Sequence, residues 1–182
     1  YAYVAAHGAG LQIVDVSDPD ALSFVGAVDT PKLASGLAVS GSMVYVADGW
    51  GGLRIVDAAN VAAPVEVGSW DRDVAMVAVR GTHAYLAGRN GLHVVDVSES
   101  MTPTQVATYS LNYASDVVVT GTLAYVAADD EGLHVVDVGD PLSPTQVAVI
   151  PFDGARGLHV AGSRLYVVAG DSGEGLTVLD IA

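Results

Sequence analysis

Cysteine is absent from this 182-residue sequence, which excludes disulfide bonds, thiolate metal sites and cysteine nucleophiles. Basic residues are scarce, because one lysine and six arginines face 21 acidic residues and leave a formal net charge of −14. Such a charge repels phosphate backbones and anionic lipid headgroups, so no nucleic acid partner is expected. Long apolar runs are also missing, since segments such as 117–119 and 165–169 are far too short to cross a bilayer. We therefore expect no membrane insertion.

What the sequence has in abundance is internal repetition. A five-residue phrase that ends in aspartate occurs five times, at spacings of 39 to 43 residues. Its copies begin at Leu11, Leu53, Leu92, Leu133 and Leu176. A tyrosine column keeps the same period at Tyr3, Tyr45, Tyr85, Tyr125 and Tyr166. A glycine column follows at Gly41, Gly81, Gly121 and Gly162. Three landmarks with one period indicate a tandem array of repeats.

Each repeat contains four short segments with the composition of β-strands. In one repeat these segments are 34–40, 43–47, 53–57 and 64–70. They are rich in β-branched or aromatic residues and are bounded by Gly, Asp, Asn or Pro. The glycine column suits tight hairpins between the first two segments, because glycine adopts positive φ without a Cβ clash. Four antiparallel strands per repeat follow from this pattern.

Tandem four-stranded units of this length are typical of β-propeller blades, which radiate around a central channel. We therefore predict an all-β propeller of antiparallel blades with a repeat of about 40 residues. Helical solenoids are excluded, because Pro, Gly and period-two runs interrupt every window that a helix would need. A β-helix or a β-sandwich is the competing all-β interpretation.

The repeated phrase resembles a known family. Leu-x-Ile/Val-Val-Asp, followed by Val-Ser-Asp-Pro-like turns and a Pro-Val-x-Val-Gly segment, is similar to the LVIVD repeat of bacterial and archaeal surface proteins, over essentially the whole chain. More loosely, residues 36–41 followed by 44–47 resemble the YVTN propellers, in which the first of these strands lies innermost against the channel. The resemblance implies a fold and a surface location, and it implies no particular ligand.

The strand order implied by this resemblance divides the chain into blades. Residues 1–28 supply strands two to four of one blade, and 155–182 supply strands one to three of another. Complete blades are expected over 34–70, 73–109 and 114–150. Both ends fall inside a blade. We therefore expect a segment of a longer propeller of roughly six to eight blades, or one whose ring a second chain completes, since unpaired edges associate.

Two columns have structural explanations. The aspartate that ends each phrase is expected to accept a backbone N–H in the following turn, as Asx turns do. The tyrosine column is expected to pack between blades, with its hydroxyl reaching a polar partner. Neither column needs a catalytic role.

Variation between repeats concentrates in two sets of loops, which open on the same face of a propeller. The links between blades are 29–34, 70–73, 110–114 and 151–156. The hairpins between second and third strands are 7–10, 48–52, 88–91, 128–132 and 170–175. Short, similar turns occupy the opposite face. The loop face is therefore the candidate binding surface.

Several charged and aromatic residues on these loops are candidates for ligand contact at the channel mouth. They are Lys32, Arg72, Asp73, Tyr113, Asp116 and Arg156. Arginine offers a bidentate fork, so this group predicts a carboxylate-bearing or otherwise anionic ligand. The alternative is that each cation pairs with a neighbouring aspartate as a solvated surface charge. Trp50 and Trp70 are candidate aromatic contacts, although each can instead pack under its own loop.

Acidic residues in two hairpins have the hard oxygen donors that calcium prefers. They are Asp129, Asp130, Glu131, Asp171 and Glu174. Their spacing does not match an EF-hand loop, so a solubilising role is the alternative. No other cofactor is expected.

The histidines and the Gly-Asp-Ser-Gly segment at 170–173 do not form a catalytic motif. His93 and His134 occupy the same column on different blades and are expected to face outward, so they do not share a metal. His159 is the only histidine expected near the channel. The Gly-Asp-Ser-Gly segment has no partner histidine in a matching context, and small turn residues are expected there.

Two hypotheses for function follow. The first is a non-enzymatic structural or interaction module of an exported cell-surface protein, which binds a protein or a glycan through its loop face. The lysine-poor, acidic composition favours export. The alternative is an enzyme or a small anionic-ligand site at the channel mouth. Convergence of the candidate polar side chains in one pocket would favour the alternative, whereas a flat, solvated arrangement would favour the module.

Overall fold

The computed structural model describes residues 1–170 and 175–182, and this part of the chain forms strands and no helix. It therefore holds no helix long and apolar enough to span a membrane. The strands are β1 (Ala2–Ala5), β2 (Leu11–Asp15), β3 (Ser23–Val28), β4 (Gly36–Ser40), β5 (Met43–Ala47), β6 (Leu53–Asp57), β7 (Val65–Trp70), β8 (Val74–Arg80), β9 (His83–Asp96), β10 (Thr104–Tyr113), β11 (Asp116–Thr120), β12 (Leu123–Ala127), β13 (Leu133–Asp137), β14 (Thr145–Ile150), β15 (Ala155–Ala161), β16 (Arg164–Ala169) and β17 (Leu176–Asp180).

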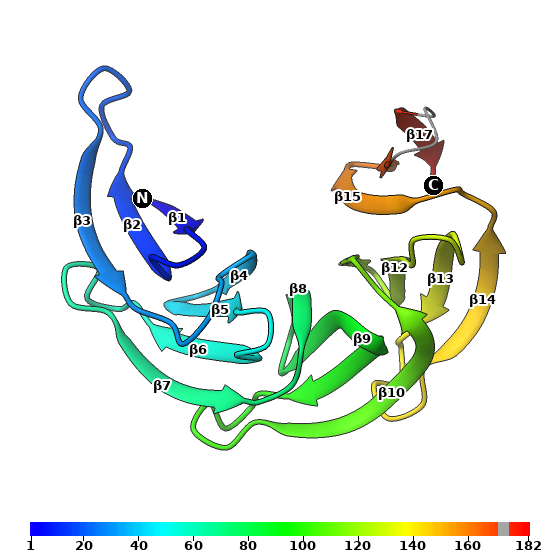
Figure 1. The fold of residues 1–182 in the computed structure, drawn as a ribbon, viewed down its shortest axis with the longest axis horizontal. Coiled ribbons are helices and arrows are strands. Elements are labelled where there is room, and N and C mark those ends of the chain that lie inside the picture. Colours follow the sequence, from blue (N-terminus) through cyan, green and yellow to red (C-terminus); the bar gives the residue numbers. More distant parts are fainter. Residues whose placement is uncertain (171–174) are drawn as a thin grey trace.

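These strands form five antiparallel sheets in which consecutive strands pair. The sheets are β1–β3, β4–β7, β8–β10, β11–β14 and β15–β17. Figure 1 shows them radiating around an open arc, with β4, β8, β11 and β15 toward the inside and β3, β7, β10 and β14 along the outside. The N-terminal and C-terminal sheets lie at the two ends of the arc (Figure 1). This is the arrangement of propeller blades, so the predicted fold class is confirmed.

The third sheet departs from the prediction at its loop end. β9 covers two predicted strands and the hairpin 88–91 between them, since its first half pairs with β8 and its second half with β10. The reversal occurs at Asn90 and Gly91, which have φ of 71° and 112°. β10 continues to Tyr113, past the predicted blade end at 109, because Leu111 is buried in the core and the Asn112 N–H donates to Glu131 Oε1 at 2.9 Å. The predicted link 110–114 is therefore mostly strand.

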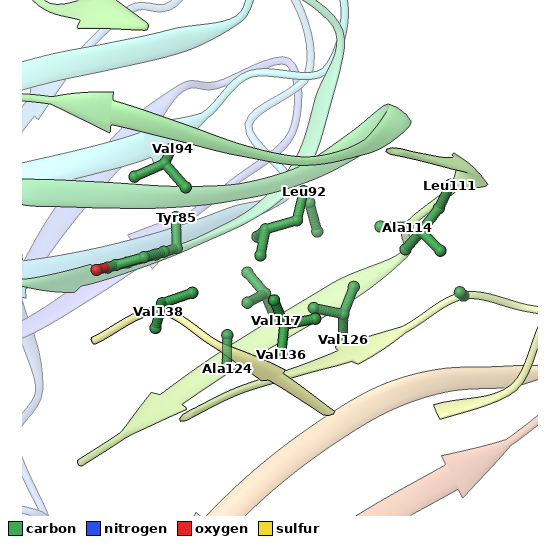
Figure 2. Close-up of a cluster of buried hydrophobic side chains, with 12 residues drawn as sticks. Tyr85, Leu92, Val94, Leu111, Ala114, Val117, Ala124, Val126, Val136 and Val138 are labelled. Carbon is green, nitrogen blue, oxygen red and sulfur yellow. The ribbon is translucent and has the colours of Figure 1, made fainter. Parts of the chain in front are cut away.

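The core consists of four apolar clusters, each between two successive sheets. Figure 2 shows one of them, in which Tyr85 and Leu92 of β9 pack against Val117, Val126 and Val136 of the fourth sheet. Alternate residues of β9, such as Leu86, point instead toward the second sheet. Complete burial of a Val or Leu side chain contributes about 1.5–3 kcal/mol to stability. Contact between neighbouring sheets therefore stabilises the blades.

The repeated aspartate forms the predicted turn in every copy. Its Oδ1 accepts the backbone N–H two residues later, in Asp15–Ser17 (2.9 Å), Asp57–Ala59 (2.9 Å), Asp96–Ser98 (2.8 Å), Asp137–Gly139 (2.8 Å) and Asp180–Ala182 (3.1 Å). This hydrogen bond holds the pKa of Asp96 below its ordinary value. The structural role predicted for this column is confirmed.

Three members of the tyrosine column, and the four glycines, take their predicted places. Tyr45, Tyr85 and Tyr125 are buried in clusters between sheets. The glycines of the first hairpins have positive φ: Gly41 (62°), Gly81 (60°), Gly121 (56°) and Gly162 (61°). A residue with a Cβ is strained in that conformation, which accounts for the column.

Candidate functional site

A cavity of about 630 Å³ opens on the loop face, where the first four sheets meet. Its volume lies within the range of about 300–1,000 Å³ that is typical of small-molecule sites. The lining residues are His7, Lys32, Leu33, Ser35, Gly49, Trp50, Asp73, Val74, Ala75, Tyr113 and Ser115. They come from the two loop sets that vary most between repeats, together with the starts of β8 and of the strands beside it. Lys32, Trp50, Asp73 and Tyr113 are thus brought to one cavity.

Backbone bridges between neighbouring blades hold the rim of this cavity. His7 and Ala34 exchange two hydrogen bonds, at 2.9 and 3.1 Å, and the Val74 N–H donates to the Gly49 carbonyl at 3.1 Å. His7 has φ of 50°, although it is not a glycine. The bridges fix where each hairpin stands relative to the next blade, whatever side chain the hairpin carries.

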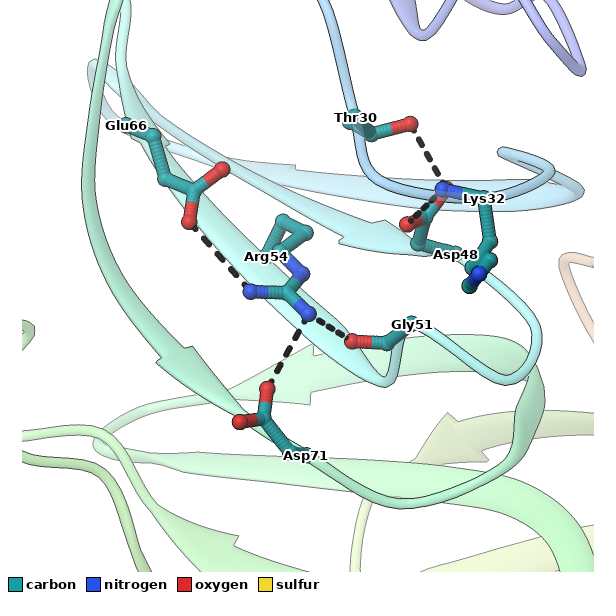
Figure 3. Close-up of polar contacts among 7 residues, drawn as sticks. All are labelled: Thr30, Lys32, Asp48, Gly51, Arg54, Glu66 and Asp71. Atoms are coloured by element: carbon teal, nitrogen blue, oxygen red, sulfur yellow. Dashed lines mark hydrogen bonds and ion pairs between the residues drawn. The ribbon is translucent and has the colours of Figure 1, made fainter.

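Asp48 adds a side-chain anchor to the rim. Its carboxylate is completely buried and accepts the Thr30 hydroxyl at 2.6 Å and the Lys32 backbone N–H at 2.8 Å (Figure 3). It thereby fixes the link 29–34 to the hairpin that carries Trp50. Sequence reasoning missed this role. The available signal was an acidic residue in a column whose other members are Ala or Gly.

Two aromatic side chains are presented at the cavity. Trp50 is 79% exposed on a tight turn in which the Gly51 N–H donates to the Asp48 carbonyl at 2.9 Å. Tyr113 ends β10 and is 38% exposed. Burial raises the pKa of the Tyr113 phenol, and the nearby carboxylates of Asp73 and Asp129 raise it further. The phenol therefore remains a hydrogen-bond donor at neutral pH.

Two predicted site residues lie outside the cavity, with partners of their own. The Arg72 guanidinium lies 5.9 Å from the centre of the Trp70 ring, and the centre of the His93 ring lies 5.4 Å from the same ring. Arg156 forms an ion pair with Asp129 at 3.5 Å. Of the three cations predicted at the channel mouth, Lys32 lines the cavity, and Arg72 and Arg156 are not among its lining residues. Arg156 follows the alternative, in which the cation pairs with an aspartate.

Trp70 is not a loop-face contact either. It closes β7 and packs against His93 of the next sheet. The alternative, that it packs beneath its own loop region, describes it better.

Asp116 lies in a second cavity, of about 390 Å³, among the inner strands. Its two carboxylate oxygens accept the backbone N–H groups of Val117 and Leu158, both at 2.7 Å. Burial raises the pKa of Asp116 to about 6, and these two hydrogen bonds partly oppose the rise. Because both oxygens are used by the backbone, Asp116 fastens β11 to β15 and is not part of the loop-face cavity.

The predicted calcium ligands that the structure describes, Asp129, Asp130 and Glu131, do not form a group that could hold a metal ion. Asp129 pairs with Arg156, and Glu131 accepts the Asn112 N–H. Asp130 and Glu131 border an outer groove with Phe152 and Asp153. Asp171 and Glu174 lie outside the described residues. Across 1–170 and 175–182, no group of three or more His, Cys, Asp or Glu residues is placed to hold a metal ion.

The outward orientation predicted for His93 and His134 is wrong. Both rings are buried against the fourth strand of the preceding blade. His93 Nε2 bonds to the Arg89 carbonyl at 2.9 Å, and burial lowers the pKa of this ring. His134 Nδ1 lies 3.0 Å from the Tyr109 hydroxyl. Their column therefore faces the preceding blade, since the His93 ring lies 5.4 Å from the Trp70 ring and the His134 ring 5.9 Å from the Tyr109 ring.

Arg54, in the same column as these histidines, is a further residue that the sequence did not single out. It contacts Glu66 at 3.5 Å, Asp71 at 3.0 Å and the Gly51 carbonyl (Figure 3). It thus joins β6, β7 and the Trp50 hairpin.

Histidine placement near the channel is only partly as predicted. His159 lines the inner cavity, as expected, but His7 lines the loop-face cavity and was not foreseen.

Comparison with models of known protein families identifies the family of this chain. Four segments match the model of the LVIVD repeat, over residues 1–30, 32–72, 71–110 and 112–149. The chain belongs to the LVIVD repeat family. The fifth copy of the phrase lies beyond these matches, and its strands β15–β17 form the same meander as the other LVIVD repeats. The comparison with curated proteins gave no match.

Two solved structures share the fold of these LVIVD repeats. The computationally designed Ika4 protein has a TM-score of 0.64 at 11% identity, over 82% of this chain and 91% of Ika4. The computationally designed Ika8 protein has a TM-score of 0.71 at 10% identity, over 98% of this chain and 55% of Ika8. The chain therefore spans about half the length of Ika8. At these identities the likeness concerns the fold alone.

Proposed function

We propose that this chain is a non-enzymatic interaction module of an exported cell-surface protein, and that its loop face binds a glycan or a protein. The observation that carries the proposal is the loop-face cavity, where residues that differ between repeats meet. The columns that repeat, such as the turn aspartates, serve the scaffold instead. A ring of similar blades can thus present a non-repetitive surface at one end.

The arrangement of the charged residues supports binding over catalysis. Of the five charged residues predicted at the channel mouth, Lys32 and Asp73 line the cavity. The other three, Arg72, Asp116 and Arg156, are held elsewhere by ring, backbone or carboxylate partners. Trp50 and Tyr113, by contrast, are of the residue types that dominate contact energies in binding sites.

Two further features support the surface assignment. The sequence is acidic and nearly free of lysine, with a net charge of −14, which disfavours nucleic acid as a partner. The repeats of this chain also resemble the repeats of bacterial and archaeal surface proteins, which favours a surface location.

Apolar side chains exposed on the first and last sheets indicate a second kind of partner, namely further blades. Leu176 is 61% exposed on the last sheet, whereas its equivalents Leu53, Leu92 and Leu133 are completely buried by the next blade. Val4 on the first sheet is likewise 43% exposed. We infer that blades of the same repeat cover both faces, from the same parent or a second chain. Sedimentation that depends on concentration in the wild type and not in Leu176→Asp would support a second chain, and a strictly monomeric wild type would contradict a second chain.

Retention on isolated bacterial cell envelopes tests the binding function. We expect the purified wild-type chain to bind the envelopes and the Trp50→Ala variant not to bind them. Met101→Ala is the matched control, because Met101 is 77% exposed in a turn of the opposite face. Pretreatment of the envelopes with periodate identifies a glycan, and pretreatment with protease identifies a protein. Equal loss in both variants, or no retention of the wild type, would contradict the proposal.

A further inference from the structure

The charges around the loop-face cavity leave one cation without a partner. Arg89 pairs with Asp73 at 3.7 Å and Arg156 with Asp129 at 3.5 Å. Arg54 contacts Glu66 and Asp71, and the Arg72 guanidinium lies over Trp70. Among the described residues, Lys32 has no ion pair. Its backbone is fixed by Asp48, and its side chain extends away from that carboxylate (Figure 3).

An unpaired ammonium group has consequences in this chain. The net charge of −14, which comes from 21 acidic residues against seven basic ones, repels anions at long range. A single lysine at a cavity therefore acts only on an anionic group that is already seated there. A carboxylate in contact with Lys32 gains a charge-assisted hydrogen bond of the kind that is about twice as strong as a neutral one.

The remaining lining indicates what carries that carboxylate. Trp50 presents an indole ring that is largely free, on a turn stiffened by backbone hydrogen bonds. A flat apolar ring of this kind complements the C–H face of a pyranose. Asp73 and Tyr113, also in the lining, supply an acceptor and a donor for ring hydroxyls. The Ser35 and Ser115 hydroxyls already donate to backbone carbonyls, so they can act on a ligand only as hydrogen-bond acceptors.

We propose that the loop-face cavity binds a uronic acid unit of a glycan, with the sugar ring against Trp50 and its carboxylate at Lys32. This proposal rests on the binding function above and names the chemistry of its ligand. The hydroxyl groups of the sugar bond to Asp73 and Tyr113. Neutral sugars of the same shape bind more weakly, because they leave the ammonium group unpaired.

The test is an array of oligosaccharides that contain glucuronic, galacturonic or mannuronic acid, printed beside their neutral counterparts. Affinities for the best uronate and its neutral counterpart are then measured by calorimetry. We expect the uronate to bind at least about tenfold more tightly, the equivalent of one charge-assisted contact. Raising the salt concentration should reduce this preference, because exposed charges are screened.

Three variants separate the parts of the site. Lys32→Gln should remove the preference for the uronate and leave binding of the neutral sugar unchanged, and Lys32→Arg should restore most of it. Trp50→Ala should lower the affinity for both the uronate and the neutral sugar. Arg164→Gln removes the same charge from the exposed first residue of β16, at the opposite face, and should change the affinity for neither ligand.

The outcomes also distinguish this proposal from the broader one. Binding of no uronate on the array, or a uronate preference that survives in Lys32→Gln, overturns the proposal. If envelope retention is abolished by protease and not by periodate, the interaction module stands and the uronate ligand is wrong. If Trp50→Ala is retained on envelopes like the wild type, both fail.

Discussion

The buried Asp48 carboxylate provides a quantitative test of how the loop face is held. Asp48→Ala removes the acceptor for the Thr30 hydroxyl and for the Lys32 backbone N–H, at 2.6 and 2.8 Å in the wild type. Hydrogen bonds to a charged group contribute about 1.5–3 kcal/mol each. Thr30 is only half-buried, so its hydroxyl regains water in the variant, and release of the buried carboxylate offsets part of the loss. We therefore expect a loss of about 2 kcal/mol.

Urea unfolding followed by tryptophan fluorescence suits this measurement. The only two tryptophans, Trp50 and Trp70, belong to the blade that Asp48 anchors, so the signal reports on that blade. Asp29→Ala is the matched control, because Asp29 lies in the same link and is exposed. Thr30→Val should lose about half as much stability as Asp48→Ala, since it removes one of the two bonds. Identical urea midpoints for Asp48→Ala and Asp29→Ala would refute the anchor.

Three further predictions concern pH and packing. The pKa of Asp116 is raised to about 6, so between about pH 4 and 6 the folded state holds a proton that the unfolded state has released. The free energy of unfolding should therefore fall by up to about 3 kcal/mol as pH rises through this range. Asp116→Asn should flatten this slope in urea melts at several pH values. Burial lowers the pKa of His93, so the free energy of unfolding should fall as pH drops below about 6.5, because the unfolded state takes up a proton before the folded state does. His93→Gln should not show this loss. Gly68→Ala would place a Cβ 1.9 Å from the Ser100 carbonyl oxygen and should cost about 1–3 kcal/mol, whereas Gly8→Ala meets nothing within 4 Å and should leave the thermal midpoint unchanged.

The scaffold could be predicted because each of its requirements recurs. An Asx turn needs only an aspartate and the N–H two residues later, and these lie in one short segment of sequence. Period-two alternation likewise determines which faces of a strand are buried. Local signals of this kind, repeated five times, specify the blade. The exception is β10, where Leu111 and Asn112 extend the strand because of contacts with the neighbouring blade.

The position of the candidate site could be predicted from the sequence, but the set of residues that line it could not. The sequence placed Lys32, Asp73 and Tyr113 at one end of the propeller, where they do line one cavity. It did not show that Arg72 lies over Trp70 or that Arg156 pairs with Asp129, because those partners are chosen in three dimensions. A charged residue on a loop has several aspartates within reach. Only the geometry shows that Lys32, at the cavity, has no ion pair among the described residues.

The hairpins explain how this family of repeats separates its scaffold from its binding surface. His7, Gly49 and Asp129 occupy the same place in three hairpins and have φ of 50°, 57° and 45°. Each forms the same backbone bridge to the next blade, although their side chains are an imidazole, a hydrogen atom and a carboxylate. Because the bridge uses only N–H and C=O groups, it needs no particular side chain, although the positive φ favours glycine, asparagine, aspartate or histidine at this position. Substitution there changes what the loop face presents to a ligand while the contact between blades persists, and a repeated fold thereby acquires a non-repeated surface.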